Sequence, residues 1–199
     1  MPGAELLRPR ADLDGESFTG DLSAAEVGDA LLLECRLTDA DLTGWRARGI
    51  RLVGCALERV HGTDLDLSLG EWAETSLAGA RLGAVSLAGA SLRGCRVEGG
   101  KIDYLNLRGA VLTDVTLVDC ILLEPDLAEA TLTRVSFEGC RVVSPELRAA
   151  TLAEVDLTGA DLVAPHGVTS LRGARLSRRQ LLDLAPLLAH ELGIVVVDD

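Results

Sequence analysis

The stretch AGARLGAVSLAGASLRGC, Ala78 to Cys95, repeats its pattern every five residues. Leu82, Leu87 and Leu92 are five residues apart, and a small residue stands two positions before each of them. An amphipathic helix places apolar residues three or four apart, and a half-buried strand places them at every second position. A period of five fits neither pattern, so this stretch predicts another architecture.

The period extends over most of the chain. Every fifth residue from Leu22 to Leu162 continues the register without a phase break, and only Ala47 and Gly62 in it lack a large side chain. Leu13 and Phe18 begin the pattern one residue out of phase, and Leu171 and Leu176 resume it after the irregular piece VAPHGVTS.

A second register, two residues earlier, holds mostly small side chains. One large and one small inward residue per five fits a chain that turns a corner every five residues. Four corners close a coil of twenty, and stacked coils pair like parallel strands at about 4.8 Å per coil. The repeats predict about seven coils and a rod of roughly 35 Å, which contacts only neighbouring coils and needs capped ends.

The units ADLTG (Ala40–Gly44), AGARL, AGASL, RGAVL and GADLV resemble the pentapeptide repeat family from about Leu13 to Leu176. The resemblance implies an all-β solenoid, a right-handed quadrilateral parallel β-helix. We expect a flexible N-terminus over residues 1–10, the β-helix over 11–176, and a C-terminal cap or dimerisation module over 177–199. Some members of the family protect DNA gyrase from quinolones and resemble duplex DNA in width and charge. The lack of a long loop insertion resembles the mycobacterial quinolone-resistance type.

The net charge of −12 restricts the class of partner. An acidic chain is a poor candidate for binding nucleic acid directly, because phosphate binding needs clustered Lys and Arg. The negative charge also disfavours binding to an anionic membrane surface. No stretch approaches eighteen apolar residues, and the first residues lack the apolar core of a signal peptide. These features predict a cytoplasmic protein without a membrane span.

All five cysteines fall in the small inward register. Cys35 and Cys55 are one coil apart, and so are Cys120 and Cys140. Stacked neighbours at about 4.8 Å lie within the Cα range of a disulfide. Buried, reduced thiols that act as small apolar side chains are the favoured interpretation.

The sequence SRRQLLDLAPLLAHELG changes to a helical period. Ser177 and Gln180 form a capping-box pattern, Gly193 is a natural stop, and Pro186 is expected to kink or split the helix. The following IVVV, residues 194–197, predicts a short strand.

This module predicts either a cap or a dimer interface, and the wide apolar stripe favours a homodimer. The resemblance supports the dimer, because such modules join two rods end to end in gyrase-inhibiting members. The expected interface residues are Leu181, Leu184, Leu188, Leu192, Ile194 and Val196.

No constellation for catalysis is visible in the sequence. His61, His166 and His190 are not paired with a nucleophile, and no phosphate-binding loop or metal-ligand spacing appears. We therefore expect a non-enzymatic protein with no catalytic, cofactor-binding or metal-binding residues, and no cofactor. A cavity near Gly62 and Ala47 is the feature that would favour a small-molecule binder.

The residues that could bind a partner lie on the outer surface of the predicted rod. When outward residues are sorted onto four faces, each face is mildly acidic and none carries a single sign of charge. The possible partner-binding residues are Tyr104, Asp103, Asp64 and Asp41, with Tyr104 the best contact candidate; Trp45 and Trp72 fall in inward registers. The resemblance makes DNA gyrase a possible partner and the chain a possible DNA mimic. The alternative is a scaffold or regulatory protein with an unrelated partner.

Overall fold

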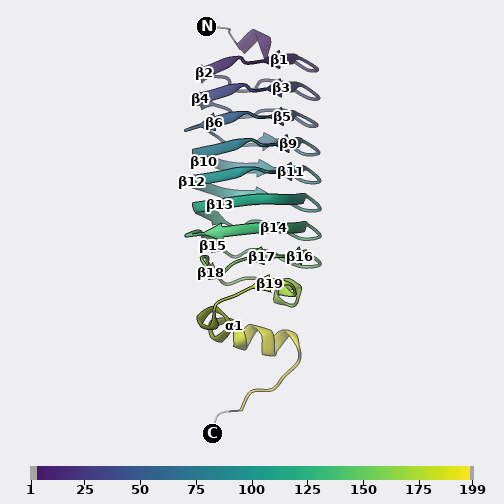
Figure 1. The fold of residues 1–199 in the computed structure, drawn as a ribbon, viewed down its shortest axis with the longest axis vertical. Coiled ribbons are helices and arrows are strands. Elements are labelled where there is room, and N and C mark those ends of the chain that lie inside the picture. Colours follow the sequence, from purple (N-terminus) through teal and green to yellow (C-terminus); the bar gives the residue numbers. More distant parts are fainter. Residues whose placement is uncertain (1–3, 198–199) are drawn as a thin grey trace.

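The computed structural model describes residues 4–197, which form a parallel β-solenoid followed by a single helix (Figure 1). Successive coils pair with an offset of twenty residues: Leu77 pairs with Val97, Val97 with Leu117, and Leu117 with Phe137. Like side chains therefore stack on like side chains along the rod. This register, with a corner every five residues, confirms the four-sided solenoid.

Short strands alternate with corners along the coils. One side of the rod shows eight stacked rungs among the described residues: β1 (Asp12–Asp14), β3 (Leu31–Leu33), β5 (Arg51–Val53), β9 (Glu71–Ala73), β11 (Ser91–Arg93), the beginnings of β13 (Val111–Leu123) and β14 (Thr131–Glu138), and β16 (Thr151–Ala153). The other strands are β2 (Ser17–Asp21), β4 (Arg36–Asp41), β6 (Ala56–Glu58), β7 (His61–Gly62), β8 (Leu65–Asp66), β10 (Ser76–Ser86), β12 (Arg96–Asn106), β15 (Arg141–Val143), β17 (Val155–Asp156), β18 (Asp161–Val163) and β19 (Ala174–Arg175).

The register changes at both ends of the rod. Phe18 pairs with Leu37 at an offset of nineteen, and the offset of twenty begins only at Gly20, after an irregularity in β2. At the other end, Val155 pairs with Ala174, again nineteen residues away. These one-residue changes explain why the apolar pattern is out of phase before Leu22 and after the irregular piece.

Most corners use a left-handed backbone, which recurs at intervals of about five residues. Glu74, Asp114 and Asp119 have φ of 51°, 56° and 51°. A left-handed conformation costs about 1–2 kcal/mol for a residue with a side chain. Hydrogen bonds between coils offset this cost; the N–H of Glu74, for example, donates to Arg93 O at 2.9 Å.

The core is filled by the two inward registers, as the sequence predicts. Leu32, Leu52, Leu112 and Leu132 are almost fully buried in one column, which Trp72 interrupts. Trp45 is also buried, and its Nε1–H donates to Leu22 O at 2.8 Å.

Each end of the solenoid is covered by a short segment. At the N-terminal end, the 3-10 helix η1 (Ala4–Leu6) leads into Leu7, which is buried against the core. At the other end, η2 (Val168–Leu171) precedes α1 (Arg178–Glu191), and Leu184 of α1 is buried against the core. The capping box of Ser177 and Gln180 is present.

Three details of the C-terminal module differ from the prediction. Residues 194–197 form no strand: they leave the rod after the N–H of Ile194 donates to Ala189 O of α1 at 2.8 Å, and they pair with no strand of the described chain (Figure 1). A strand needs a neighbouring strand for its backbone groups, and none of the described strands lies beside IVVV. Pro186 does not split the helix, which continues for five residues beyond it. Leu184, predicted in a dimer interface, packs on the rod instead.

Candidate interaction surface

Several outward carboxylates are fixed by backbone N–H groups two residues later. Oδ1 of Asp41, Asp126 and Asp156 each accepts such a hydrogen bond at 2.9 Å, from Thr43, Ala128 and Thr158 respectively. Hydrogen bonds from the hydroxyl and the N–H of the threonine lower the pKa of Asp41 and of Asp156. The hydrogen bonds therefore hold all three carboxylates in one orientation and favour the ionised form of Asp41 and Asp156.

Arginines neutralise carboxylates of the neighbouring coil along the middle of the rod. Arg59 donates to Asp39 at 2.7 and 2.8 Å, and Arg134 donates to Asp114 at 2.6 and 2.9 Å. Hydrogen bonds from these guanidinium groups lower the pKa of Asp39 and Asp114. Both pairs join residues twenty apart, so the coil register brings them together. As a result, arginines of neighbouring coils compensate much of the negative charge in the central part of the rod.

In the part of the chain that the structure describes, no ion pair involves a carboxylate of residues 12–34. Between Ala11 and Cys35 the sequence contains no Lys or Arg, while the carboxylates in this range are Asp12, Asp14, Glu16, Asp21, Glu26, Asp29 and Glu34. The charge of the rod is therefore uneven along its axis rather than around it. Each of the four faces is mildly acidic, so a comparison of the faces does not reveal this feature. The run of acidic residues without Lys or Arg is nevertheless visible in the sequence.

A groove lies at one edge of the rod around the exposed side chain of Tyr104. Its volume is about 360 Å³, and both Tyr104 and Asp64 line it. Asp103 lies within 2.6 Å of Lys101 Nζ and does not line the groove. Asp41 belongs to a turn outside the groove. The structure thus brings together two of the four predicted partner-binding residues.

The C-terminal module exposes a large apolar surface. Of the predicted interface residues, Leu181, Leu192, Ile194 and Val196 are 51–73% exposed, whereas Leu188 is partly buried against the core. Further apolar residues of the wide stripe and of IVVV are also exposed: Leu182, Leu187, Val195 and Val197.

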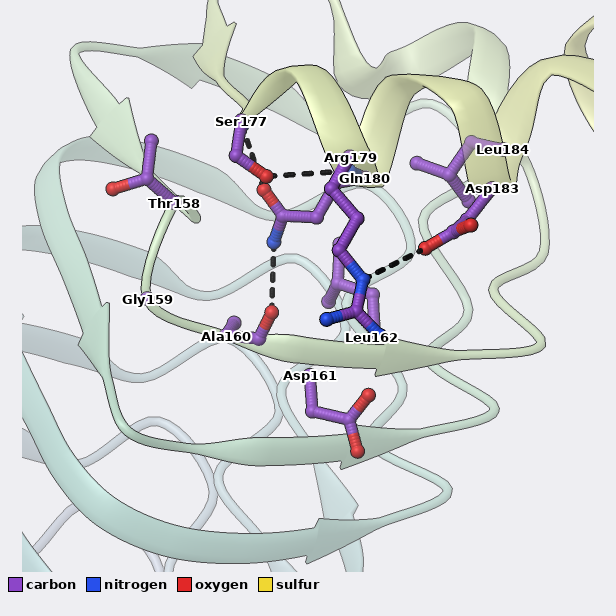
Figure 2. A pocket seen from close by; sticks show the side chains of 10 residues that line it. All are labelled: Thr158, Gly159, Ala160, Asp161, Leu162, Ser177, Arg179, Gln180, Asp183 and Leu184. Atoms are coloured by element: carbon purple, nitrogen blue, oxygen red, sulfur yellow. Dashed lines mark hydrogen bonds and ion pairs between the residues drawn. The ribbon is translucent and has the colours of Figure 1, made fainter.

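A second groove, of about 500 Å³, lies between α1 and the last coil (Figure 2). The Gln180 side chain reaches across it, and its Nε2 donates to Leu157 O at 2.6 Å and to Ala160 O at 2.7 Å. Gln180 therefore covers two carbonyl groups that a further coil would have bound. Beyond these two groups, β18 pairs on one side only, with β15.

The core encloses one apolar cavity of about 60 Å³, lined by residues that include Leu42, Leu57, Trp72 and Leu82. It lies close to Gly62, where the sequence lacks a large inward side chain. Ligand pockets typically have volumes of about 300–1,000 Å³, so this cavity does not fit a metabolite-sized molecule.

The five cysteines are buried and free. Burial in the apolar core raises the pKa of the Cys35, Cys55 and Cys95 thiols. The pKa of the Cys120 thiol is also raised, first by its hydrogen bond with Cys140 and then by burial. These thiols serve the packing of the core.

The three histidines lie apart in the structure. His61 Nε2 is 4.0 Å from Asp41 Oδ2, His166 pairs with Glu146 at the end of the rod, and His190 is exposed on α1. Within residues 4–197, no group of three or more His, Cys, Asp or Glu side chains could hold a metal ion. The only α-helix described, α1, is too short to cross a membrane.

Comparisons with known proteins agree with this geometry. The family model "Pentapeptide repeats" matches residues 106–142 with eight copies. Among solved structures, a trypsin-treated variant of QnrB1, a plasmid-mediated fluoroquinolone resistance protein, is 22% identical over 94% of this chain and 97% of its own, with a TM-score of 0.48. HetL, a pentapeptide repeat protein involved in heterocyst differentiation regulation in the cyanobacterium Nostoc sp. strain PCC 7120, is 21% identical over 83% of this chain and 89% of its own, with a TM-score of 0.44.

No curated protein matches the chain. The five-residue unit that the family model matches over residues 106–142 continues, with the same coil register, from Gly20 to Val163. The chain is therefore a pentapeptide repeat protein.

Proposed function

We propose that this protein is a non-enzymatic, cytoplasmic rod that acts through its outer surface as a DNA-mimicking modulator of DNA gyrase, of the quinolone-resistance type. The observation that carries the proposal is the uncompensated negative charge of the first coil. A basic, DNA-binding surface is the kind of partner that this charge attracts.

The density of charge can be compared with that of duplex DNA. Eight coils at about 4.8 Å span roughly 38 Å, and a duplex of that length carries about 22 phosphate charges. The net charge of the chain is −12, so the average density is about half that of DNA. Residues 12–30, which form the first coil, carry six carboxylates in one coil height, where a duplex presents about three charges. The local charge density of the first coil therefore reaches that of duplex DNA, whereas the average charge density of the rod does not.

The orientation of the carboxylates supports the same function. Those held by turns, such as Asp21 with Ser23 N–H at 3.0 Å, are ionised and preorganised. A partner that binds them loses little conformational entropy on the side of the rod, as with the fixed phosphates of a duplex.

Gyrase supercoiling, measured with the purified protein titrated in and with or without a quinolone, tests the proposal. Inhibition at micromolar concentration, or relief of drug-induced cleavage, is expected. The sharper test is a variant with Asp12→Asn, Asp14→Asn, Glu26→Gln and Glu34→Gln, which should lose at least about tenfold in potency, as expected for several electrostatic contacts.

A matched control removes four exposed carboxylates outside the first coil: Glu71→Gln, Glu74→Gln, Glu138→Gln and Glu154→Gln. Its charge change is identical, so it should retain most of the activity. No effect of the wild-type protein on gyrase from an actinobacterium or an enteric bacterium would refute the gyrase proposal and favour an unrelated partner. Equal losses in the two variants would refute the role of the first coil.

The functional unit in this proposal is a homodimer joined through the C-terminal module. Ile194 and Val195 are 57% and 85% exposed, and contiguous apolar surface of this kind marks interaction sites. The free edge of β18 beside α1 offers backbone groups to an added strand, and residues 195–197 of a second copy belong to no strand of their own chain. Dimerisation would give the IVVV segment the partner that it lacks within one chain.

Light scattering at micromolar concentration should give twice the chain mass of 20.9 kDa. The double variant Leu182→Asp and Val196→Asp should be a folded monomer, whereas Val111→Asp, at an exposed apolar position on the rod, should remain a dimer. A wild-type monomer at this concentration would contradict the dimer.

A further inference from the structure

We propose that the Tyr104 corner binds an arginine side chain of a basic protein partner. The Tyr104 corner is the edge of the rod formed by Asp64, Ala84, Tyr104 and Glu124. The inference rests on the proposed function in one respect, namely that the outer surface binds a basic partner. It adds the place on the rod and the type of partner side chain that binds there.

The Tyr104 corner departs from the regular geometry of the rod. Asp64 and Glu124 have the usual left-handed corner, with φ of 58° and 48°. Between them, β10 and β12 run through the corner at Ala84 and Tyr104 without a turn. The groove of about 360 Å³ lies at these two unturned coils.

Specific residues produce this departure. Thr63 Oγ1 accepts a hydrogen bond from the N–H of Ala84 at 3.1 Å. Gly83 leaves room for the Thr63 side chain, because a Cβ at Gly83 would lie 2.8 Å from Thr63 Cβ. The groove is therefore built into the local sequence of these coils.

An aromatic ring stands in the groove. Tyr104 is the only tyrosine of the chain and is 57% exposed. The groove also includes Leu65, Val85 and Leu105, whose side chains are buried in the core. These residues therefore line the groove almost only with their backbone, and the exposed ring of Tyr104 is its aromatic surface. An exposed ring accepts a flat group stacked on its face, and a guanidinium gains from the negative face of the ring as well.

The charges around the ring select a cation. The groove is lined by four carboxylates, of Asp64, Asp66, Glu124 and Asp126. Arg46 pairs with Asp64 at 2.7 Å, and Arg108 pairs with Asp126 at 3.2 Å. Arg48 lies close enough to Asp66 to favour its ionised form, so three cations face four anions. The rim therefore has a net negative charge and repels phosphates and acidic peptides.

Glu124 supplies the carboxylate that accepts hydrogen bonds from the guanidinium of the partner. It is exposed, and no hydrogen bond or ion pair joins its side chain to another residue between 4 and 197. It stands one coil beyond Tyr104, about 4.8 Å along the axis. A guanidinium stacked on Tyr104 can donate two hydrogen bonds to Glu124 in its own plane, which the compact ammonium of lysine cannot do while stacked.

A titration of the ¹⁵N-labelled protein with acetylated tri-arginine amide, followed by NMR, tests the proposal. We expect the largest shifts at the amides of Ala84, Tyr104 and Glu124. Tyr104→Ala should weaken binding at least threefold, and Tyr104→Phe should retain it because the ring face remains. Val111→Ala, at an exposed apolar position away from the groove, should bind as the wild type does.

Shifts largest in residues 12–34 or spread evenly along the rod, or equal binding by Tyr104→Ala, would overturn the proposal. Equal affinity for tri-lysine would overturn the preference for arginine. The titration contains no gyrase, so its result is independent of the supercoiling assay. Localised arginine binding without any effect on gyrase would refute the gyrase proposal alone.

Discussion

Gly100 lies against the backbone of Ala80, one coil away, so closely that a side chain cannot be added. A Cβ at Gly100 would lie 2.5 Å from Ala80 O and 2.9 Å from Ala80 N. Its φ of 135° is also one that residues with a side chain rarely adopt. The pairing of Ala80 with Gly100 in the ladder between β10 and β12 therefore depends on a glycine.

Gly100→Ala should lower the free energy of unfolding by roughly 2–4 kcal/mol, from backbone strain and overpacking together. The neighbouring Gly99→Ala is the matched control. Gly99 has φ of 53° and open space around its Cβ position, so its loss should be about 1 kcal/mol. Urea unfolding followed by circular dichroism measures both. Equal decreases in the free energy of unfolding for the two variants would show that the contact between Gly100 and Ala80 is not close.

The inward register predicts a sharp difference between adjacent residues on β13. Leu112 is 3% exposed and Val111 is 45% exposed. Leu112→Lys would bury an unpaired ammonium at a cost of several kcal/mol and should prevent folding. Val111→Lys should change the free energy of unfolding by less than about 1 kcal/mol. A soluble Leu112→Lys protein with an unchanged melting curve would refute the inward assignment.

The fixed carboxylates predict loss of stability in acid. The pKa of Asp39, Asp41, Asp114 and Asp156 is lowered in the folded protein, so the unfolded chain binds more protons as the pH falls. Their contribution is complete above the unfolded value of about 3.9 and is lost as the pH falls from there through the folded values. The urea midpoint should be level from pH 7 to 5 and fall below about pH 4.

Asp156→Ala should make this decline shallower, because it removes one of the shifted groups. A wild-type midpoint that does not change between pH 5 and pH 2.5 would show that these carboxylates make no net contribution to stability.

Buried thiols should be unreactive in the native protein. Cys35, Cys55 and Cys95 are at most 4% exposed, and burial raises the pKa of each thiol. The hydrogen bond with Cys120 lowers the pKa of Cys140 to about 7, but both side chains are at most 3% exposed. A thiol reagent at pH 8 should therefore label no cysteine in the folded protein and all five in denaturant. Rapid labelling of the native protein would mean that coils open locally or that the inward assignment of the cysteines is wrong.

The core was predictable because the five-residue period fixes it directly. The sequence from Leu22 to Leu162 assigns large and small inward residues, and nearly all of them are buried. The ends were harder, because Phe18 and Leu176 depend on one-residue changes of register that follow from the cap geometry. Residues 194–197 have strand propensity but no strand neighbour, and propensity alone does not supply one.

The candidate surface was only partly predictable, since outward positions tolerate many residues. The sequence identifies Tyr104 as outward, but the groove depends on where Thr63 places its hydroxyl and on a corner without a turn. The amphipathic pattern predicts an apolar stripe on α1, but which leucine faces the rod depends on how the helix docks. Leu184 is buried for that reason, while Leu181 is exposed.

The most direct test of the central claim is competition between the protein and DNA for gyrase. A labelled duplex bound to gyrase is titrated with the protein at low salt, and again at higher salt. We expect displacement of the duplex at micromolar protein, weaker displacement at higher salt, and still weaker displacement by the variant that lacks the carboxylates of Asp12, Asp14, Glu26 and Glu34. A duplex that stays bound throughout the titration would contradict mimicry of DNA by the outer surface.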